Sequence, residues 1–77
     1  MDTKILKQLL IESLPNAVIT VTGDGRHFEI SVESAAFIGK SKLKQHQMVN
    51  DILQKYIASG ELHAISLKTF IPLADEL

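Results

Sequence analysis

Residues 17–33, AVITVTGDGRHFEISVE, decide the fold of this 77-residue chain. Segment 17–22 is rich in β-branched residues, which favour an extended strand. The triplet Gly23-Asp24-Gly25 is the strongest turn signal in the sequence. In segment 27–33, three apolar residues alternate with polar ones. We therefore predict a hairpin whose second strand has one buried face and one face exposed to water.

Helical patterns flank this hairpin on both sides. Upstream, Asp2 or Thr3 can cap a helix that Pro15 ends, because the residue before a proline is pushed out of the α region. Its apolar stripe contains Ile5, Leu6, Leu9, Leu10 and Leu14. Downstream, Ser41 suits the N-cap of a second helix and Gly60 suits its end. The apolar face predicted for that helix contains Leu43, Val49, Ile52, Leu53, Tyr56 and Ile57.

The rest of the chain completes a two-layer arrangement. Segment 34–40 is predicted to be a connection, 62–70 a third strand, and 73–77 a short terminal helix that follows Pro72. The predicted order is α-β-β-α-β-α, with a three-stranded mixed sheet covered by helices. A third strand that follows a helix can pair in parallel through a right-handed crossover. We therefore expect one α+β domain over 1–77.

Composition narrows the classes of function. Apolar residues make up 45% and charged residues 22%, a globular balance, and the net charge of −1 gives no overall attraction to nucleic acid or membranes. We see neither a membrane-spanning run nor a secretory signal, so we expect a cytoplasmic protein without a membrane partner. The absence of cysteine excludes a cysteine nucleophile, a thiolate zinc site and a self-contained iron–sulfur cluster.

Catalytic motifs do not appear in the sequence. We find no G-x-S-x-G, no Walker loop and no H-E-x-x-H. Glu29 and Glu33 alternate with core residues, a pattern typical of a wet sheet face and not of an acid–base pair. We therefore expect a protein that binds partners and is not an enzyme.

Three stretches together resemble the BolA family. They are Gly23-Asp24-Gly25-Arg26-His27-Phe28, then FIGK at 37–40 followed by HQMV at 46–49, and LHAISLKT at 62–69. Their order and spacing span essentially the whole chain and are closest to small bacterial members with a Gly-Asp-Gly-x-His-Phe loop. The resemblance implies a KH-like fold, in agreement with the predicted order of elements.

Two activities follow from the resemblance. BolA-like proteins pair with monothiol glutaredoxins and share a bridging [2Fe-2S] cluster, which implies a role in iron–sulfur transfer or iron sensing. The cofactor would be held with glutathione, only in complex with the glutaredoxin, and the chain alone would carry none. Some members are also described as DNA-binding regulators of transcription and stress response. A plain interaction module with structural histidines is the third possibility.

The resemblance assigns metal binding to two histidines. His63 matches the family's most characteristic histidine, which is implied to ligate the cluster. In the family, a second ligand, either cysteine or histidine, comes from the hairpin. Here Asp24 lies roughly where the cysteine would fall, so His27 is the best remaining candidate. From the residues alone, the alternatives are a partly buried, strand-end His63 bonded to backbone and a solvated His27 beside Glu29.

Other candidate residues have structural interpretations. His46 is predicted to hydrogen-bond to the connection at 37–40 from the flank of the second helix. Gly23, Gly25 and Gly39 are assigned structural roles.

A short basic stretch carries the DNA-binding alternative. Lys40, Lys42 and Lys44 lie at a helix N-terminus, where backbone N–H groups also favour phosphate, and the predicted interface is 39–50. The other interpretation is a solvated helix start. Gly39-Lys40-Ser41-Lys42 lacks the second glycine of a KH G-x-x-G loop, and no aromatic stacking platform is evident. When free, the chain is expected to be a monomer or a weak homodimer.

Overall fold

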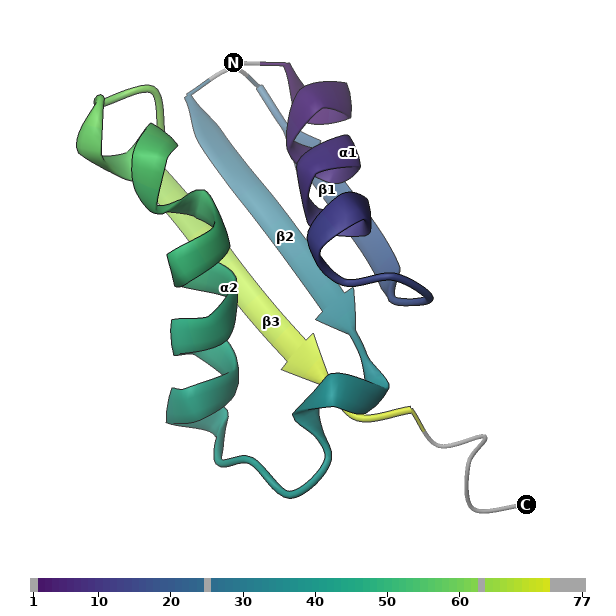
Figure 1. Cartoon of the computed structure of the whole chain (residues 1–77). Coiled ribbons are helices and arrows are strands. Elements are labelled where there is room, and N and C mark those ends of the chain that lie inside the picture. Colours follow the sequence, from purple (N-terminus) through teal and green to yellow (C-terminus); the bar gives the residue numbers. More distant parts are fainter. Residues whose placement is uncertain (1, 25, 63, 73–77) are drawn as a thin grey trace.

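The computed structural model describes residues 2–24, 26–62 and 64–72. The helices lie side by side over one face of a three-stranded sheet (Figure 1). The elements are α1 (Thr3–Ser13), β1 (Val18–Gly23), β2 (His27–Glu33), the 3₁₀ turn η1 (Ala35–Phe37), α2 (Lys42–Ala58) and β3 (Ala64–Phe70). The predicted order is confirmed through β3, and η1 is an addition to it. The terminal helix predicted at 73–77 lies outside the described residues, as do Gly25 and His63.

The helix boundaries follow from capping groups. Asp2 accepts a hydrogen bond from the backbone N–H of Lys4 at 2.9 Å, which makes it the N-cap of α1. Ser41 caps α2 through the N–H of Lys44 at 3.2 Å. These side chains satisfy N–H groups that a helix leaves without partners in its first turn. At its other end, α2 is followed by Gly60 with a φ of 85°, as predicted.

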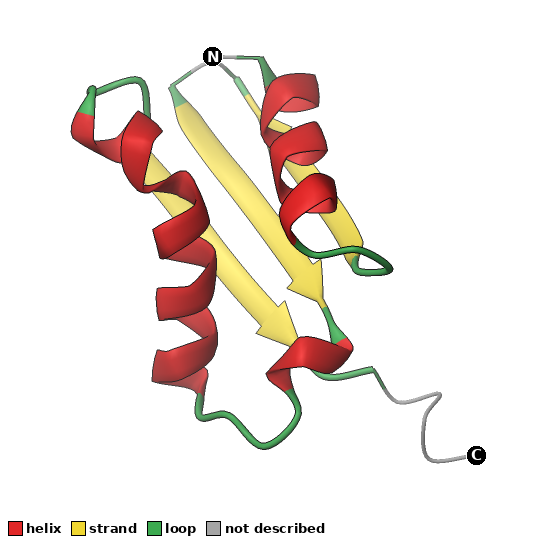
Figure 2. Ribbon diagram, in the orientation of Figure 1, coloured by secondary structure: helices red, strands yellow, loops and turns green. Residues whose placement is uncertain are grey.

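The sheet has the strand order β1-β2-β3 (Figure 2). β1 pairs with β2 in antiparallel fashion, from Val18 opposite Glu33 to Gly23 opposite Phe28. β3 pairs with β2 in parallel, so the sheet is mixed, as predicted. Because β2 and β3 are parallel, their N-terminal ends lie at the same end of the sheet. That end also carries the β1–β2 turn (Figure 1).

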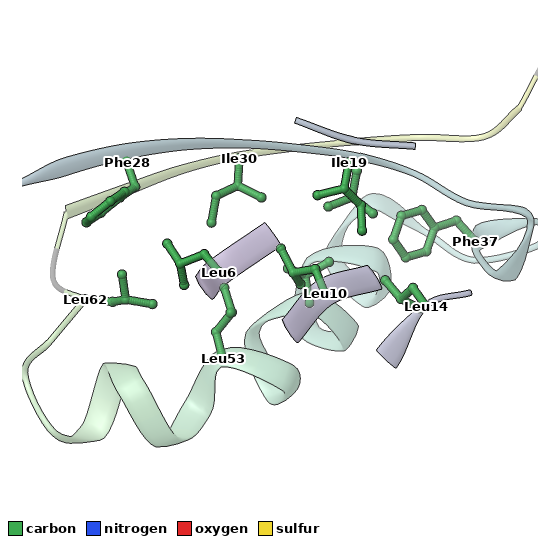
Figure 3. Close-up of a cluster of buried hydrophobic side chains, with 11 residues drawn as sticks. Leu6, Leu10, Leu14, Ile19, Phe28, Ile30, Phe37, Leu53 and Leu62 are labelled. Atoms are coloured by element: carbon green, nitrogen blue, oxygen red, sulfur yellow. The ribbon is translucent and has the colours of Figure 1, made fainter. Parts of the chain in front are cut away.

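The core lies between the sheet and the two helices, as Figure 3 shows. Alternate residues of β2 point into it, and Phe28, Ile30 and Val32 are at most 1% exposed. From α1 and α2 come further buried side chains, among them Leu6, Leu10, Val49 and Leu53. The opposite face of the sheet is not covered by either helix. Residues of β2 that alternate with the core residues, beginning with His27, lie on this open face.

Two side chains predicted to be apolar contacts are exposed instead. Ile5 is 52% and Leu43 is 71% exposed. Successive helical residues are separated by about 100° around the axis. Leu43 lies six residues before the buried Val49, so it is turned about 120° away from the core. Ile5 is one residue before the buried Leu6 and lies on the flank of the helix.

A buried polar network joins α2 to β3. Thr69 Oγ1 donates to Gln45 Oε1 at 2.7 Å, and Gln45 Nε2 donates to the carbonyl oxygen of Lys40 at 2.8 Å. Gln45 is four residues before Val49, so it shares the buried face of α2 and is 2% exposed. The hydrogen bond to the connection that we predicted for His46 is thus made by its neighbour, Gln45.

Candidate functional site

The turn between β1 and β2 is organised by one carboxylate. Asp24 Oδ1 accepts hydrogen bonds from the backbone N–H groups of Arg26 and His27, both at 2.9 Å. These bonds favour the ionised form, with the His27 N–H as the largest cause, and lower the pKa of Asp24 below its ordinary value. The side chain that lies where a family cysteine was expected therefore holds the backbone at the start of β2.

Gly23 allows the turn to close tightly. A Cβ atom at this position would lie 2.7 Å from the carbonyl oxygen of His27 and 2.7 Å from Cδ1 of Phe28. Both approaches are closer than van der Waals contact, so a side chain here would displace either the backbone of His27 or a core ring. Gly39, in the connection before α2, has a φ of 81°, a left-handed conformation that favours glycine.

His27 lies on the open face of the sheet, at the first residue of β2. Its side chain is exposed, and its Nε2 lies 3.1 Å from the hydroxyl oxygen of Ser66 on β3. The Cα partner of His27 across the parallel ladder is Ala64. Ala64 directly follows His63 in the sequence, and His63 itself lies outside the described residues. Of the two predicted metal ligands, the structure therefore positions His27.

The roles of two residues in this region were not predicted from the sequence. Asp24 was noted in the turn and at the position of a family cysteine, but its bonds to the backbone were not predicted, although an aspartate followed by free backbone N–H groups is a recognisable signal for such bonding. Ser66 carries no local signal, because its proximity to His27 depends on the pairing of β2 with β3. The parallel register of β2 and β3 brings the two side chains together on the same face of the sheet.

A shallow hollow lies on the open face of the sheet and includes Ser66, the residue that His27 contacts. Its lining residues come from all three strands, and its volume is about 240 Å³. They include Thr22, Glu29, Ser66 and Lys68. Six of its seven lining residues have hydroxyl or charged side chains, and Ile30 is the exception.

The three lysines of the predicted phosphate patch are not equivalent. All three side chains belong to exposed residues. However, Nζ of Lys42 donates to the carbonyl oxygen of Thr69 and lies 5.3 Å from the centre of the Phe70 ring. Lys42 thus joins the start of α2 to the end of β3, which leaves Lys40 and Lys44 as the lysines of this segment without such an anchor.

Within residues 2–24, 26–62 and 64–72, no group of three or more His, Asp or Glu side chains could hold a metal ion. Among the helices of these same residues, none has the length and apolar character that crossing a membrane requires.

Comparisons with known proteins agree with the fold described above. A family model described as BolA-like protein matches residues 8–73. Acid stress protein IbaG of Escherichia coli K12 is 33% identical over 72 residues, which cover 94% of this chain and 86% of IbaG. A solved bolA protein homologue from Coxiella burnetii is 33% identical, with a TM-score of 0.81 and coverage of 100% and 99%. The BolA domain of SufE1 from Arabidopsis thaliana is 28% identical, with a TM-score of 0.81 and coverage of 97% and 94%.

Proposed function

The chain belongs to the BolA-like family, and on that premise we propose that it binds a monothiol glutaredoxin and shares a bridging [2Fe-2S] cluster with it. The role would be iron–sulfur transfer or iron sensing, through binding and not through catalysis. The observation that carries this proposal is the position of His27, exposed at the end of the sheet where the strand that follows His63 begins.

The composition of the chain suits a shared cluster and not a resident one. A [2Fe-2S] cluster needs four ligands, and histidines replace cysteines on one of the two irons in Rieske centres. This chain has three histidines and no cysteine. The thiolates would therefore come from the glutaredoxin and from glutathione, while His63 and His27 are the candidate ligands from this side. Bound there, the cluster supplies one-electron redox chemistry or transferable iron and sulfide.

The surroundings of His27 suit a metal ligand. Histidines that bind metals usually donate their second ring N–H to a nearby acceptor, which fixes the ring. The hydroxyl of Ser66, 3.1 Å from Nε2, can serve as that acceptor. In that arrangement Nδ1 is the nitrogen that faces the partner. Because imidazole must be neutral to bind a metal, the shared complex is expected to weaken in acid.

Visible circular dichroism tests the proposal, because it detects a change in the surroundings of the cluster. The chain would be added to a monothiol glutaredoxin already loaded with cluster. We expect a new spectrum with the wild type, none with His63→Ala, and a weaker change with His27→Ala. His46→Ala is the matched control, since it removes an imidazole from α2, and it should behave as the wild type. A spectrum that the wild type leaves unchanged, or that His63→Ala changes equally, would rule the proposal out.

A DNA-binding regulator that uses segment 39–50 is the second candidate. In its favour, residues 34–50 contain three lysines and no carboxylate. Against it, Lys42 is bonded to β3 and the Lys44 N–H is taken by Ser41. Fluorescence anisotropy with duplex DNA at two salt concentrations tests this candidate. Binding that is absent at low salt, or that is unaffected by Lys40→Ala and Lys44→Ala, would count against it.

A further inference from the structure

We propose that β1 is a dimerisation edge, at which two copies of the chain pair in antiparallel fashion to form a continuous six-stranded sheet. Within the described part of the chain, β1 pairs with β2 alone and therefore lies at one edge of the sheet. A strand at an edge presents unpaired backbone N–H and C=O groups that can bond to another chain. This inference does not depend on the proposed binding of a cluster.

The register identifies which backbone groups are free. In an antiparallel pair, opposite residues alternate between hydrogen-bonded and non-bonded pairs. The backbone N–H of Asp24 donates to the carbonyl of His27, and these two residues continue the β1–β2 register. The residues of β1 whose backbone groups bond to β2 are therefore those with even numbers. Ile19, Val21 and Gly23 direct their N–H and C=O groups away from β2, toward the free edge.

This edge lacks the devices by which natural proteins block such pairing. Those devices are charged side chains, prolines and bulges. The sequence of β1 is VITVTG, without charge or proline, and its six residues pair with β2 without a bulge. The opposite edge is different, because β3 carries Lys68 and its Thr69 carbonyl accepts a hydrogen bond from Lys42. Of the two edges of the sheet, β1 is therefore the better suited to pair with a partner strand.

The occupant that suits this edge is a second copy of the chain. If the two-fold axis passes beside Val21, this residue pairs with its own equivalent, and Ile19 lies opposite Gly23 of the other copy. Thr20 then lies opposite Thr22, so the exposed face gains two threonine pairs, a favourable cross-strand combination. A single strand thus supplies both halves of a self-complementary interface, as two-fold symmetry requires.

The flank of α1 adds an apolar contact on the other face of the sheet. Ile5 and Ile11 lie on opposite sides of the helix, one residue before the buried Leu6 and one residue after the buried Leu10. Ile5 lines a groove with Tyr56 of α2, so the Ile11 side of the helix faces the β1 edge. Ile11 is 39% exposed there. Lys7 shares this flank, so the two copies bring like charges together, and added salt should strengthen the dimer.

The proposed dimer leaves the candidate ligand site accessible. Antiparallel pairing of β1 places the two hairpin turns at opposite ends of the six-stranded sheet. His27 lies on β2, one strand away from the interface, and its Ser66 contact is made on the side of β3. Each copy would therefore keep its own site for a partner.

Sedimentation equilibrium over a range of concentrations tests the proposal with two variants that differ at one position. In T20K/T22K, lysines lie opposite lysines across the axis, whereas in T20E/T22K, glutamates lie opposite lysines. Both changes fall on the exposed face of β1, and urea unfolding checks that both variants fold. We expect the wild type and T20E/T22K to dimerise, and T20K/T22K to do so at least about tenfold more weakly.

Amide hydrogen exchange supplies a second readout. As the protein concentration rises, exchange at Ile19 and Val21 should slow, while that at Thr20, already bonded to β2, should change little. A wild type that stays monomeric at millimolar concentration would overturn the proposal. Equal dimerisation of the two double variants would also overturn it, because the contact would then lie elsewhere or pair strands other than β1.

Discussion

Thr69→Val should lower the free energy of unfolding by about 1–3 kcal/mol, although it changes neither the charge nor the shape of the side chain much. Thr69 is 1% exposed, and its hydroxyl donates to Gln45 Oε1 at 2.7 Å. Valine fills the same space and leaves that buried oxygen without its donor. The predicted effect is the cost of an unsatisfied buried acceptor and not that of a cavity.

The size of this effect makes it measurable. A chain of 77 residues is expected to have a total stability of roughly 4–12 kcal/mol, so the loss is a substantial fraction of it. In a domain of this size, each kcal/mol shifts the Tm by about 4–8 °C. Urea unfolding followed by far-ultraviolet circular dichroism provides the free energies.

A double-mutant cycle separates the hydrogen bond from other effects. Gln45→Leu removes the acceptor, so Thr69→Val should be less destabilising in that background than in the wild type. A loss below about 0.5 kcal/mol for Thr69→Val alone, or equal losses in both backgrounds, would refute the assignment of a buried hydrogen-bond network between α2 and β3.

Three further predictions concern the turn and the basic stretch. Gly23→Ala forces a Cβ atom to within 2.7 Å of the His27 carbonyl oxygen, and urea unfolding should show a loss of about 1–3 kcal/mol. The pKa of Asp24 is lowered from 3.8, mainly by the hydrogen bond from the His27 N–H. The ionised side chain therefore stabilises the fold above about pH 4, and this stabilisation is lost as the pH falls through the lower pKa of the folded state. Asp24→Asn should therefore be less stable than the wild type near neutral pH and equal to it below the folded-state pKa, and parallel pH profiles would contradict this. Lys42→Met loses a hydrogen bond to β3 and a contact with the Phe70 ring. A loss of about 1 kcal/mol should lower its Tm by several degrees. An equal drop in Lys44→Met would contradict the assignment of this anchor to Lys42.

Local patterns in the sequence predicted the elements of this fold well. The hairpin, the Ser41 cap and the stop at Gly60 each depend on residues within a few positions of one another. Alternation along β2 also placed His27 on the exposed face, because the period of two is set by the strand itself.

The features that local patterns did not predict depend on which face of a helix meets the sheet. Leu43 is apolar, yet it lies in the first turn of α2 and is turned away from the core. Gln45 is polar, yet it is buried because Thr69 and the Lys40 carbonyl can satisfy its amide. The hydrogen-bonded partners of such a residue come from other elements, so no local pattern reveals them.

The candidate site could be predicted only in part for a similar reason. The family resemblance pointed to His27 and His63, and the structure then placed His27 beside Ser66. That pair is separated by 39 positions and meets because β2 and β3 are parallel neighbours. The anchoring of Lys42 on Phe70 likewise depends on how α2 meets the end of β3.

Pulsed electron paramagnetic resonance of the reduced cluster, shared with a monothiol glutaredoxin, tests the central claim most directly. Only the histidines of this chain would carry nitrogen-15. We predict a nitrogen-15 coupling to the cluster that disappears in His63→Ala and persists in His46→Ala. A cluster that forms in the complex without any such coupling would show that this chain supplies no ligand, and would contradict the account.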